Sequence, residues 1–131
     1  LVDADGAPTI TLGVILGYAC WPLAWLLGIP AAECMEAGRL IGLKTVANEF
    51  IAFDQLGRAT IGEGGLSQRT VDILTYALAG FSNFGAIGIQ VGGIGGLEPS
   101  RKNDLAQLGL RAMFGGLLAC CMTGAVAGLL L

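Results

Sequence analysis

The chain of 131 residues is 54% apolar and 13% charged, contains 22 glycines and carries a formal net charge of −3 at pH 7. Because soluble domains carry about 25% charged residues, this composition favours an integral membrane protein. The few basic residues form no stripe that could follow a phosphate backbone, so nucleic acid is not expected as a partner.

The residue types also exclude several catalytic chemistries. The chain has no histidine, which removes histidine-based acid–base chemistry and histidine-ligated metals. Its four cysteines lack metal or redox spacing and are interpreted as small packing residues. The glycine-containing stretches 38–45 and 92–96 fit neither a phosphate-binding loop nor a dinucleotide fingerprint. With no nucleophile–base pair or metal cluster, the sequence predicts neither an enzyme nor a bound cofactor.

The first charge-free window, residues 6–32, is long enough for a transmembrane helix at about 9–29, because a span needs about 20 apolar residues. Tyr18, Trp21 and Trp25 suit an interfacial belt near the end of this span. The chain begins at Leu1 with neither a methionine nor the pattern of a secretory leader. We therefore expect it to be the C-terminal portion of a larger protein.

Residues 30–58 interrupt apolar sequence with charges and cannot form a simple span. Pro30 suits a first helical residue, while Gly38 and Gly42 weaken the middle of the segment. Two half-helices of about 13 residues would each reach about 20 Å, to the bilayer midplane and back. The pattern predicts a re-entrant hairpin with its turn near residues 44–48. A hairpin lying in water at the membrane surface is the alternative.

A polar loop is expected at about 59–69, with Ser67 as the N-cap of the next helix. Glycines recur through residues 70–97 and predict a broken span there, followed by a loop at about 98–104 and a final span at about 105–131. The basic residues of the second loop and its flank favour the cytoplasmic side, which puts the first loop and the C-terminus outside. These elements form a single unit, residues 1–131.

Glu49 is the residue best suited to bind a solute. An ionisable group near the membrane midplane costs about 2.5–3.5 kcal/mol on insertion scales and therefore faces a cavity or a partner. At the start of the second half-helix its carboxylate would meet unpaired backbone N–H groups and the positive end of the helix dipole. In the alternative surface hairpin, Glu49 would be solvated or paired with Lys44.

The second candidate is Asn83, an amide among glycines and aromatic residues in the middle of the broken span. A helix break at membrane depth is tolerated where the backbone is buried in protein or lines a cavity. The side chain offers both a donor and an acceptor, which suits a sugar hydroxyl. A helix–helix hydrogen bond is an equal alternative.

Two longer motifs stand out, GLKTVANEFIAF at residues 42–53 and YALAGFSNFGAIGI at residues 76–89. They resemble the patterns G-x-K-x-x-x-N-E-F-V-A-(aromatic or Met) and Y-A-L-x-G-F-A-N-F-G-S-I-G-I of the concentrative nucleoside transporters, and the resemblance covers nearly the whole chain. The resemblance implies an all-α integral membrane fold whose transmembrane helices, re-entrant hairpin and broken helix form the second half of an inverted-repeat transporter core. It also implies that the full-length protein is a homotrimer.

By this resemblance, Glu49 and Asn83 bind the ribose of a nucleoside, and Phe81 is an aromatic residue lining the same pocket. Ala86 stands where many family members have a serine that hydrogen-bonds the sugar, and Ser82 replaces the usual alanine. Further substrate-binding candidates are thus Asn48, Ser82 and Ala86.

The implied activity is secondary active transport of nucleosides coupled to sodium or protons, with this chain supplying the ribose-binding half of the site. The coupling-ion site and the nucleobase-reading hairpin would lie upstream of Leu1, so no metal site is expected here. The expected location is the cell membrane, crossed several times, or the inner membrane in a Gram-negative bacterium. A non-transporting membrane protein of related fold, with a regulatory or assembly role, is the alternative, and the retained Glu49 and Asn83 argue against it.

Overall fold

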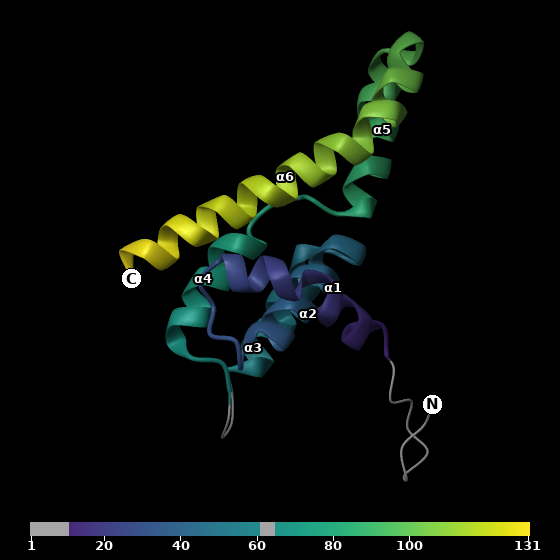
Figure 1. Ribbon diagram of the computed structural model, residues 1–131. Helices are drawn as coiled ribbons and strands as arrows, with labels where there is room; N and C mark the ends of the chain where they lie inside the picture. The colour runs from purple at the N-terminus through teal and green to yellow at the C-terminus, as the bar shows by residue number, and fades with distance from the viewer. Residues whose placement is uncertain (1–10, 61–64) are drawn as a thin grey trace.

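The computed structural model describes residues 11–60 and 65–131, and every regular element in these ranges is helical (Figure 1). In chain order the elements are α1 (Leu12–Leu26), α2 (Cys34–Val46), α3 (Glu49–Ala59), α4 (Gln68–Leu78), α5 (Phe84–Leu97), the 3-10 helix η1 (Pro99–Arg101) and α6 (Lys102–Leu130). The predicted all-α architecture is therefore confirmed for the described residues.

Local sequence signals set both ends of α1. The side-chain oxygen of Thr11 accepts a hydrogen bond from the backbone N–H of Val14 at 3.3 Å. Beyond the other end, Gly28 has a φ of 81°, a conformation that glycine adopts without strain, and the chain turns there. The 15 residues of α1 extend about 22 Å. This helix is shorter than the span predicted at about 9–29, of which residues 9 and 10 lie outside the described ranges.

Glycines bring α1 and α2 into backbone contact. A Cβ atom at Gly38 of α2 would lie 2.6 Å from the backbone oxygen of Gly17, and one at Gly42 would lie 2.6 Å from the Cβ of Leu16. These glycines lie inside an uninterrupted helix of 13 residues, where their small size permits close helix packing. Helix α2 begins at Cys34 rather than at Pro30, which we predicted as the first helical residue, because residues 31–33 form a turn.

Two interruptions divide the helical segments that follow α1. Residues 47–48 separate α2 from α3, and residues 79–83 separate α4 from α5. Both later helices begin after an asparagine whose Oδ1 accepts a backbone hydrogen bond. Asn48 accepts from Ile51 at 2.9 Å, and Asn83 accepts from Ala86 at 2.8 Å. Each break is therefore followed by a capped helix start, which satisfies one of the N–H groups that a helix terminus leaves free.

The start of α4 is tied to the connection between α1 and α2. Ser67 is the N-cap of α4, as predicted, and its side chain accepts from the backbone N–H of Thr70. The carboxylate of Glu33 accepts hydrogen bonds from the backbone N–H and the hydroxyl of Ser67, at 3.1 and 3.0 Å. One carboxylate thus joins the start of α4 to the start of α2. Residues 61–64 of the predicted polar loop lie outside the described ranges.

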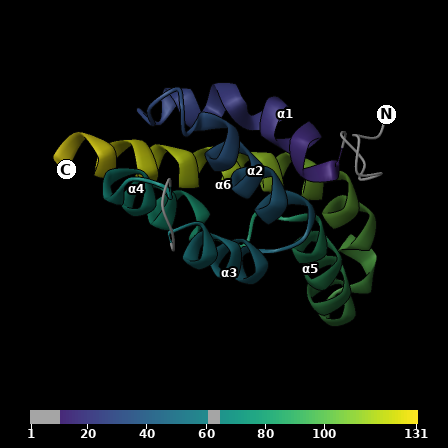
Figure 2. The same ribbon diagram turned by 90° about the horizontal axis from the view of Figure 1, so that it is seen from below.

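Helix α5 and the first part of α6 run side by side and project from the other helices (Figures 1 and 2). Most of the connection predicted at about 98–104 is helical, because Pro99 begins η1 and α6 starts at Lys102. Proline suits the first position of a helix, where its missing N–H costs nothing. The 32 residues Pro99–Leu130 are long and apolar enough to cross a membrane, whereas α1 and α5 are apolar but shorter.

The second part of α6 packs across α4. A Cβ atom at Gly124 would lie 3.0 Å from the Cβ of Ala77, so the two helices are in close contact there. Arg69 of α4 donates a hydrogen bond to the backbone oxygen of Gly128 at 2.5 Å. The buried core lies where α1, α2, α4 and this part of α6 meet, and includes Ala24, Leu40, Ile41, Ile73, Leu74, Leu78 and Leu117.

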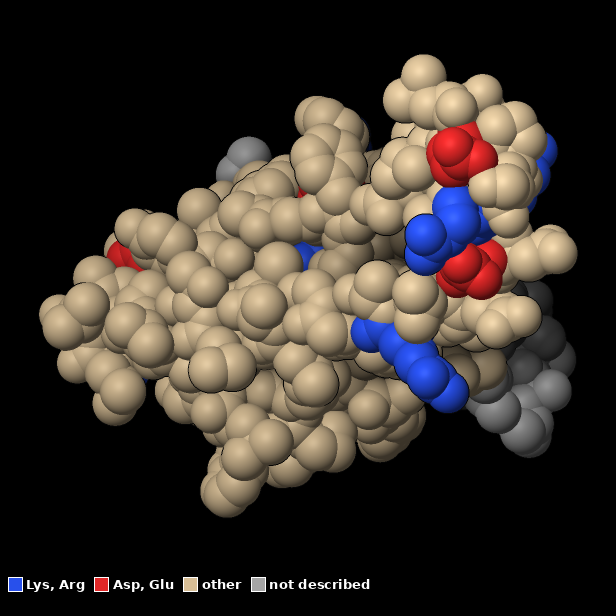
Figure 3. Space-filling view, turned by 90° about the horizontal axis from the view of Figure 1, so that it is seen from above, with Lys and Arg blue, Asp and Glu red and all other residues tan. Residues whose placement is uncertain are grey.

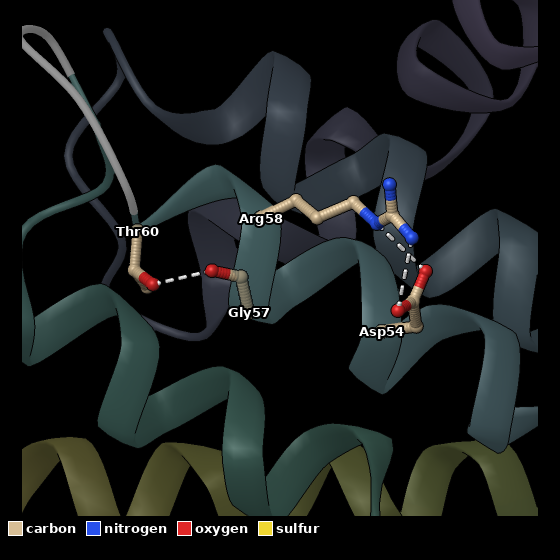
Figure 4. A network of polar contacts seen from close by, with 4 residues as sticks. All are labelled: Asp54, Gly57, Arg58 and Thr60. Atoms are coloured by element: carbon tan, nitrogen blue, oxygen red, sulfur yellow. Dashed lines mark hydrogen bonds and ion pairs between the residues drawn. The ribbon is translucent and has the colours of Figure 1, made fainter.

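The surface carries few charges and many large apolar side chains. In Figure 3 most of the visible face is uncharged and the charged side chains gather toward one side. On α3, the exposed pair Arg58 and Asp54 is joined at 2.9 Å, and the Thr60 hydroxyl donates to the Gly57 carbonyl at 2.7 Å (Figure 4). Apolar surface on α1, α5 and α6, including Leu12, Trp25, Ile89, Phe114 and Leu129, needs lipid or further protein to cover it.

The contact between α1 and α2 predicts a sharp difference between two glycine substitutions. Gly38→Ala should lower the free energy of unfolding by about 1–3 kcal/mol, because the new Cβ would overlap the backbone of α1. Gly57→Ala on α3 has no atom within 4 Å of the new Cβ, and should raise the stability by about 0.5–1 kcal/mol. Thermal unfolding in detergent measures both. Equal melting temperatures for Gly38→Ala and wild type would contradict the close packing of α1 and α2.

Candidate functional site

The two helix breaks bring Glu49 and Asn83 into direct contact. The Asn83 Nδ2 donates a hydrogen bond to Glu49 Oε2 at 2.9 Å, and both side chains are buried, with 7% and 4% of their surface exposed. Glu49 is the first residue of α3, and Asn83 immediately precedes α5. The sequence predicted both residues as site candidates, and the structure joins them.

The position of the Glu49 carboxylate is electrostatically favourable. It lies in the first turn of α3, where unpaired N–H groups and the helix dipole create positive potential. Asn83 uses both ends of its amide, because Oδ1 accepts from the N–H of Ala86 while Nδ2 donates to Glu49. The same side chain therefore caps α5 and orients the carboxylate. A charge-assisted hydrogen bond of this kind is stronger than one between neutral groups.

Lys44 does not pair with Glu49. Its side chain is fully buried, and Nζ donates a hydrogen bond to the backbone oxygen of Ala77 at 3.0 Å. Within residues 11–60 and 65–131 the ion pairs are Arg39–Glu36, Arg58–Asp54 and Arg101–Asp104, and none includes Lys44 or Glu49. The alternative of a solvated or Lys44-paired Glu49 therefore does not describe the structure. The sequence did not predict the contact of Lys44 with α4, because a basic residue in the last turn of a helix indicates only a favourable interaction with the dipole of its own helix.

Helix α6 lies behind the break between α4 and α5. A Cβ atom at Gly80 would lie 2.5 Å from the Sγ of Cys120, and one at Gly116 would lie 3.4 Å from the Cβ of Ser82. Ser82 is buried, and its Oγ has no hydrogen-bond partner among the described residues. Phe81, the preceding residue, leaves 71% of its surface exposed. Neighbouring side chains of the break thus face different surroundings.

A cavity of about 240 Å³ lies beside this break, between α5 and α6. It is lined by Phe81, Ser82, Asn83, Ala86, Ile87, Gln90, Gly109, Ala112, Met113, Gly116 and Cys120. Ala86 offers no side-chain hydroxyl here, and its backbone N–H donates a hydrogen bond to the Oδ1 of Asn83. Asn48 lies at the other break, where its Oδ1 caps α3. Neither Glu49 nor Asn48 lines this cavity, and the Asn83 amide connects the cavity to the Glu49 carboxylate. The amide, the carboxylate that it contacts and the exposed ring of Phe81 suit a ligand with hydroxyl groups and an apolar face.

Comparison with known proteins places the chain in a family. The sequence family described as "Na+ dependent nucleoside transporter C-terminus" matches residues 1–128. The uncharacterized transporter YutK of Bacillus subtilis is 46% identical over 95% of this chain and 30% of its own length. Nucleoside permease NupC of Helicobacter pylori is 39% identical over 92% of this chain and 29% of its own length. The chain thus spans about a third of the length of these relatives.

A solved structure has the same fold. The transporter CNTnw in an inward-facing, substrate-bound state superimposes with a TM-score of 0.88 and 41% sequence identity, covering 95% of this chain and 31% of that one. The predicted resemblance to the concentrative nucleoside transporters and the predicted membrane-protein fold class are confirmed by these matches. The chain belongs to the family of Na+ dependent nucleoside transporters, matching their C-terminal region, and members of this family are membrane transporters rather than enzymes.

Proposed function

We propose that this chain is the C-terminal part of a nucleoside transporter and that Glu49 and Asn83 bind the ribose of the substrate. The observation that carries the proposal is the hydrogen bond of 2.9 Å between a buried carboxylate and a buried amide from two separate helix breaks. The family description and the nucleoside permease of Helicobacter pylori support a nucleoside as the solute. Because the chain spans about a third of those relatives, the rest of the site belongs to the remainder of the protein.

The geometry suits recognition of neighbouring hydroxyls. A carboxylate accepts several hydrogen bonds, and Asn83 uses only the Oε2 of Glu49. The remaining lone pairs can accept from ribose hydroxyls, while Asn83 keeps the carboxylate oriented. Phe81, with its exposed ring next to Ser82 and Asn83, provides an apolar surface for the sugar or base. Ala86 supplies no hydroxyl, so the sugar should be recognised mainly by Glu49 and Asn83.

The proposal extends to topology and coupling. Helices α2 and α3 form the re-entrant hairpin, with the break at residues 47–48 at membrane depth, and both ends of the hairpin face the outside of a multi-pass cell-membrane protein. Transport is coupled to sodium or protons through a site in the remainder of the protein, which assembles as a homotrimer. A non-transporting relative would have no need of a carboxylate and an amide held together in this way.

The re-entrant topology predicts which sites a membrane-impermeant maleimide labels. Ala32→Cys before α2 and Gly57→Cys near the end of α3 are exposed positions, and in a background without the native cysteines both should react from outside. Ser100→Cys, in η1, is the control and should react only from the cytoplasmic side. Labelling of residues 32 and 57 from opposite sides would mean that α2 and α3 cross the membrane.

The sugar site predicts a loss of affinity in Glu49→Gln. This change keeps the size of the side chain, removes its charge and presents a donor to the ribose hydroxyls. We expect a loss of about 1.5–3 kcal/mol, or roughly 10- to 150-fold in the Kd for a ribonucleoside. Asp54→Asn makes the same chemical change at an exposed position on α3 and should leave the Kd unchanged.

Deoxynucleosides provide the second arm of this experiment. The 2′-deoxy and 3′-deoxy analogues each lack one ribose hydroxyl. Wild type should bind the analogue that lacks the hydroxyl contacting Glu49 more weakly than it binds the ribonucleoside. Glu49→Gln should show a smaller difference, because the contact is already lost. Equal binding of all three ligands by wild type and Glu49→Gln would show that Glu49 has a structural role only.

Residues 1–131 alone should not transport. Half of the proposed pocket and the ion site lie in the remainder of the protein, so vesicles containing only this chain should take up nucleoside no faster than protein-free vesicles. Vesicles containing the full-length transporter serve as the positive control. Uptake by the isolated chain would refute the division of the site between two parts of the protein.

A further inference from the structure

The proposed sugar site leaves one buried charge unexplained, the ammonium of Lys44. Its side chain has no exposed surface, and Nζ lies 3.0 Å from the backbone oxygen of Ala77. Lys44 is in the last turn of α2, and Ala77 is in the last turn of α4. The ammonium therefore lies where the C-terminal ends of two half-helices come together.

A cation at this place has a clear electrostatic reason. The last four carbonyl groups of a helix have no partner within the helix, and the C-terminal end carries the negative end of the dipole. In the interior of transporters, the C-terminal ends of interrupted helices can coordinate monovalent cations. Here, the ends of α2 and α4 have a cation supplied by the chain itself. An apolar side chain of equal volume would fill the space but would leave the Ala77 carbonyl without its donor.

The two buried contacts lie on the same pair of segments. Lys44 joins α2 to the end of α4, and beyond the two breaks Glu49 of α3 joins Asn83 at the start of α5. Lys44 and Glu49 lie on either side of the break at residues 47–48, and Ala77 and Asn83 lie at the two sides of the break at residues 79–83. The distance between the two segments at the Lys44–Ala77 contact therefore limits how closely Glu49 and Asn83 can approach each other.

We propose that the Lys44 ammonium is a tethered cation that holds the ends of α2 and α4 together and thereby positions Glu49 against Asn83. Lys44 is a positioning residue and does not touch the substrate. Its effect on sugar binding rests on the proposed function, whereas its role as a cation between two helix ends does not. Removing the side chain would open a site for a small organic cation.

Chemical rescue tests this role in the full-length transporter at constant sodium concentration. Lys44→Ala removes Cγ, Cδ, Cε and Nζ, the same set of heavy atoms as propylammonium. We expect Lys44→Ala to lower the melting temperature and to weaken ribonucleoside binding about tenfold or more. Propylammonium should restore both quantities in Lys44→Ala and change neither in wild type. The neutral analogue 1-propanol should restore neither.

Lys44→Met separates charge from packing, because it keeps most of the volume without the charge. It should bind ribonucleoside about tenfold more weakly than wild type and should not respond to propylammonium. Wild-type affinity in Lys44→Met, or equal rescue of Lys44→Ala by 1-propanol and propylammonium, would overturn the proposal. If Lys44→Ala folds only when propylammonium is present during purification, that requirement supports the proposal.

The melting temperatures keep this inference distinct from the proposed function. If wild type bound no nucleoside, the sugar site would be refuted, while selective stabilisation of Lys44→Ala by propylammonium would still establish the tethered cation. If nucleoside binding were normal in wild type and in Lys44→Met, the sugar site would stand and the tethered cation would be rejected.

Discussion

Two interrupted helical segments meet at their breaks, and the charges at the four broken ends decide how they fit together. The N-terminal ends of α3 and α5 meet at the Glu49 carboxylate and the Asn83 amide, joined at 2.9 Å. The C-terminal ends of α2 and α4 meet at the Lys44 ammonium. An anion at the positive ends and a cation at the negative ends are both stabilising. Each buried charge, which alone would oppose burial, therefore holds two helix ends together.

Small residues allow these contacts to form at short range. Gly38 and Gly42 let α2 approach the backbone of α1, and Gly124 lets α6 approach α4. Lipid is as apolar as a leucine side chain, so association of helices in a membrane depends on close packing and hydrogen bonds rather than on removal of apolar surface from water. The exposed apolar side chains of α5 and α6 accordingly do not compete with the buried contacts, because they remain in favourable surroundings.

Much of this arrangement could be predicted from the sequence because the signals are local. An acid near the expected turn of the re-entrant hairpin indicated Glu49, and an amide among glycines indicated Asn83. The alternative interpretation of Asn83, a hydrogen bond between helices, also describes its contact with Glu49, because the Asn83 amide donates to a residue of α3. Its role as the cap of α5 could have been inferred from asparagine preceding an apolar helix.

Other features could not be predicted in this way, either because they join segments far apart in the chain or because the local signal is ambiguous. The bond from Lys44 to Ala77 and the bonds from Ser67 to Glu33 require the packing of α2 against α4. The early end of α1 depends on the positive φ of Gly28, which the composition of a charge-free window does not reveal. The helical turn at Pro99 was hidden by a run of polar and charged residues that is equally typical of a loop.

The balance of charge within α2 and α3 has a consequence for electrical work. The acids Glu36, Glu49 and Asp54 are matched in number by the bases Arg39, Lys44 and Arg58, so the two helices together carry no net formal charge. Moving one elementary charge through a membrane potential of 100 mV involves about 2.3 kcal/mol. A rearrangement that moves α2 and α3 as one body through that field transfers no net charge from these helices. Any voltage dependence of such a movement must then arise from the transported ions or from charges on other helices.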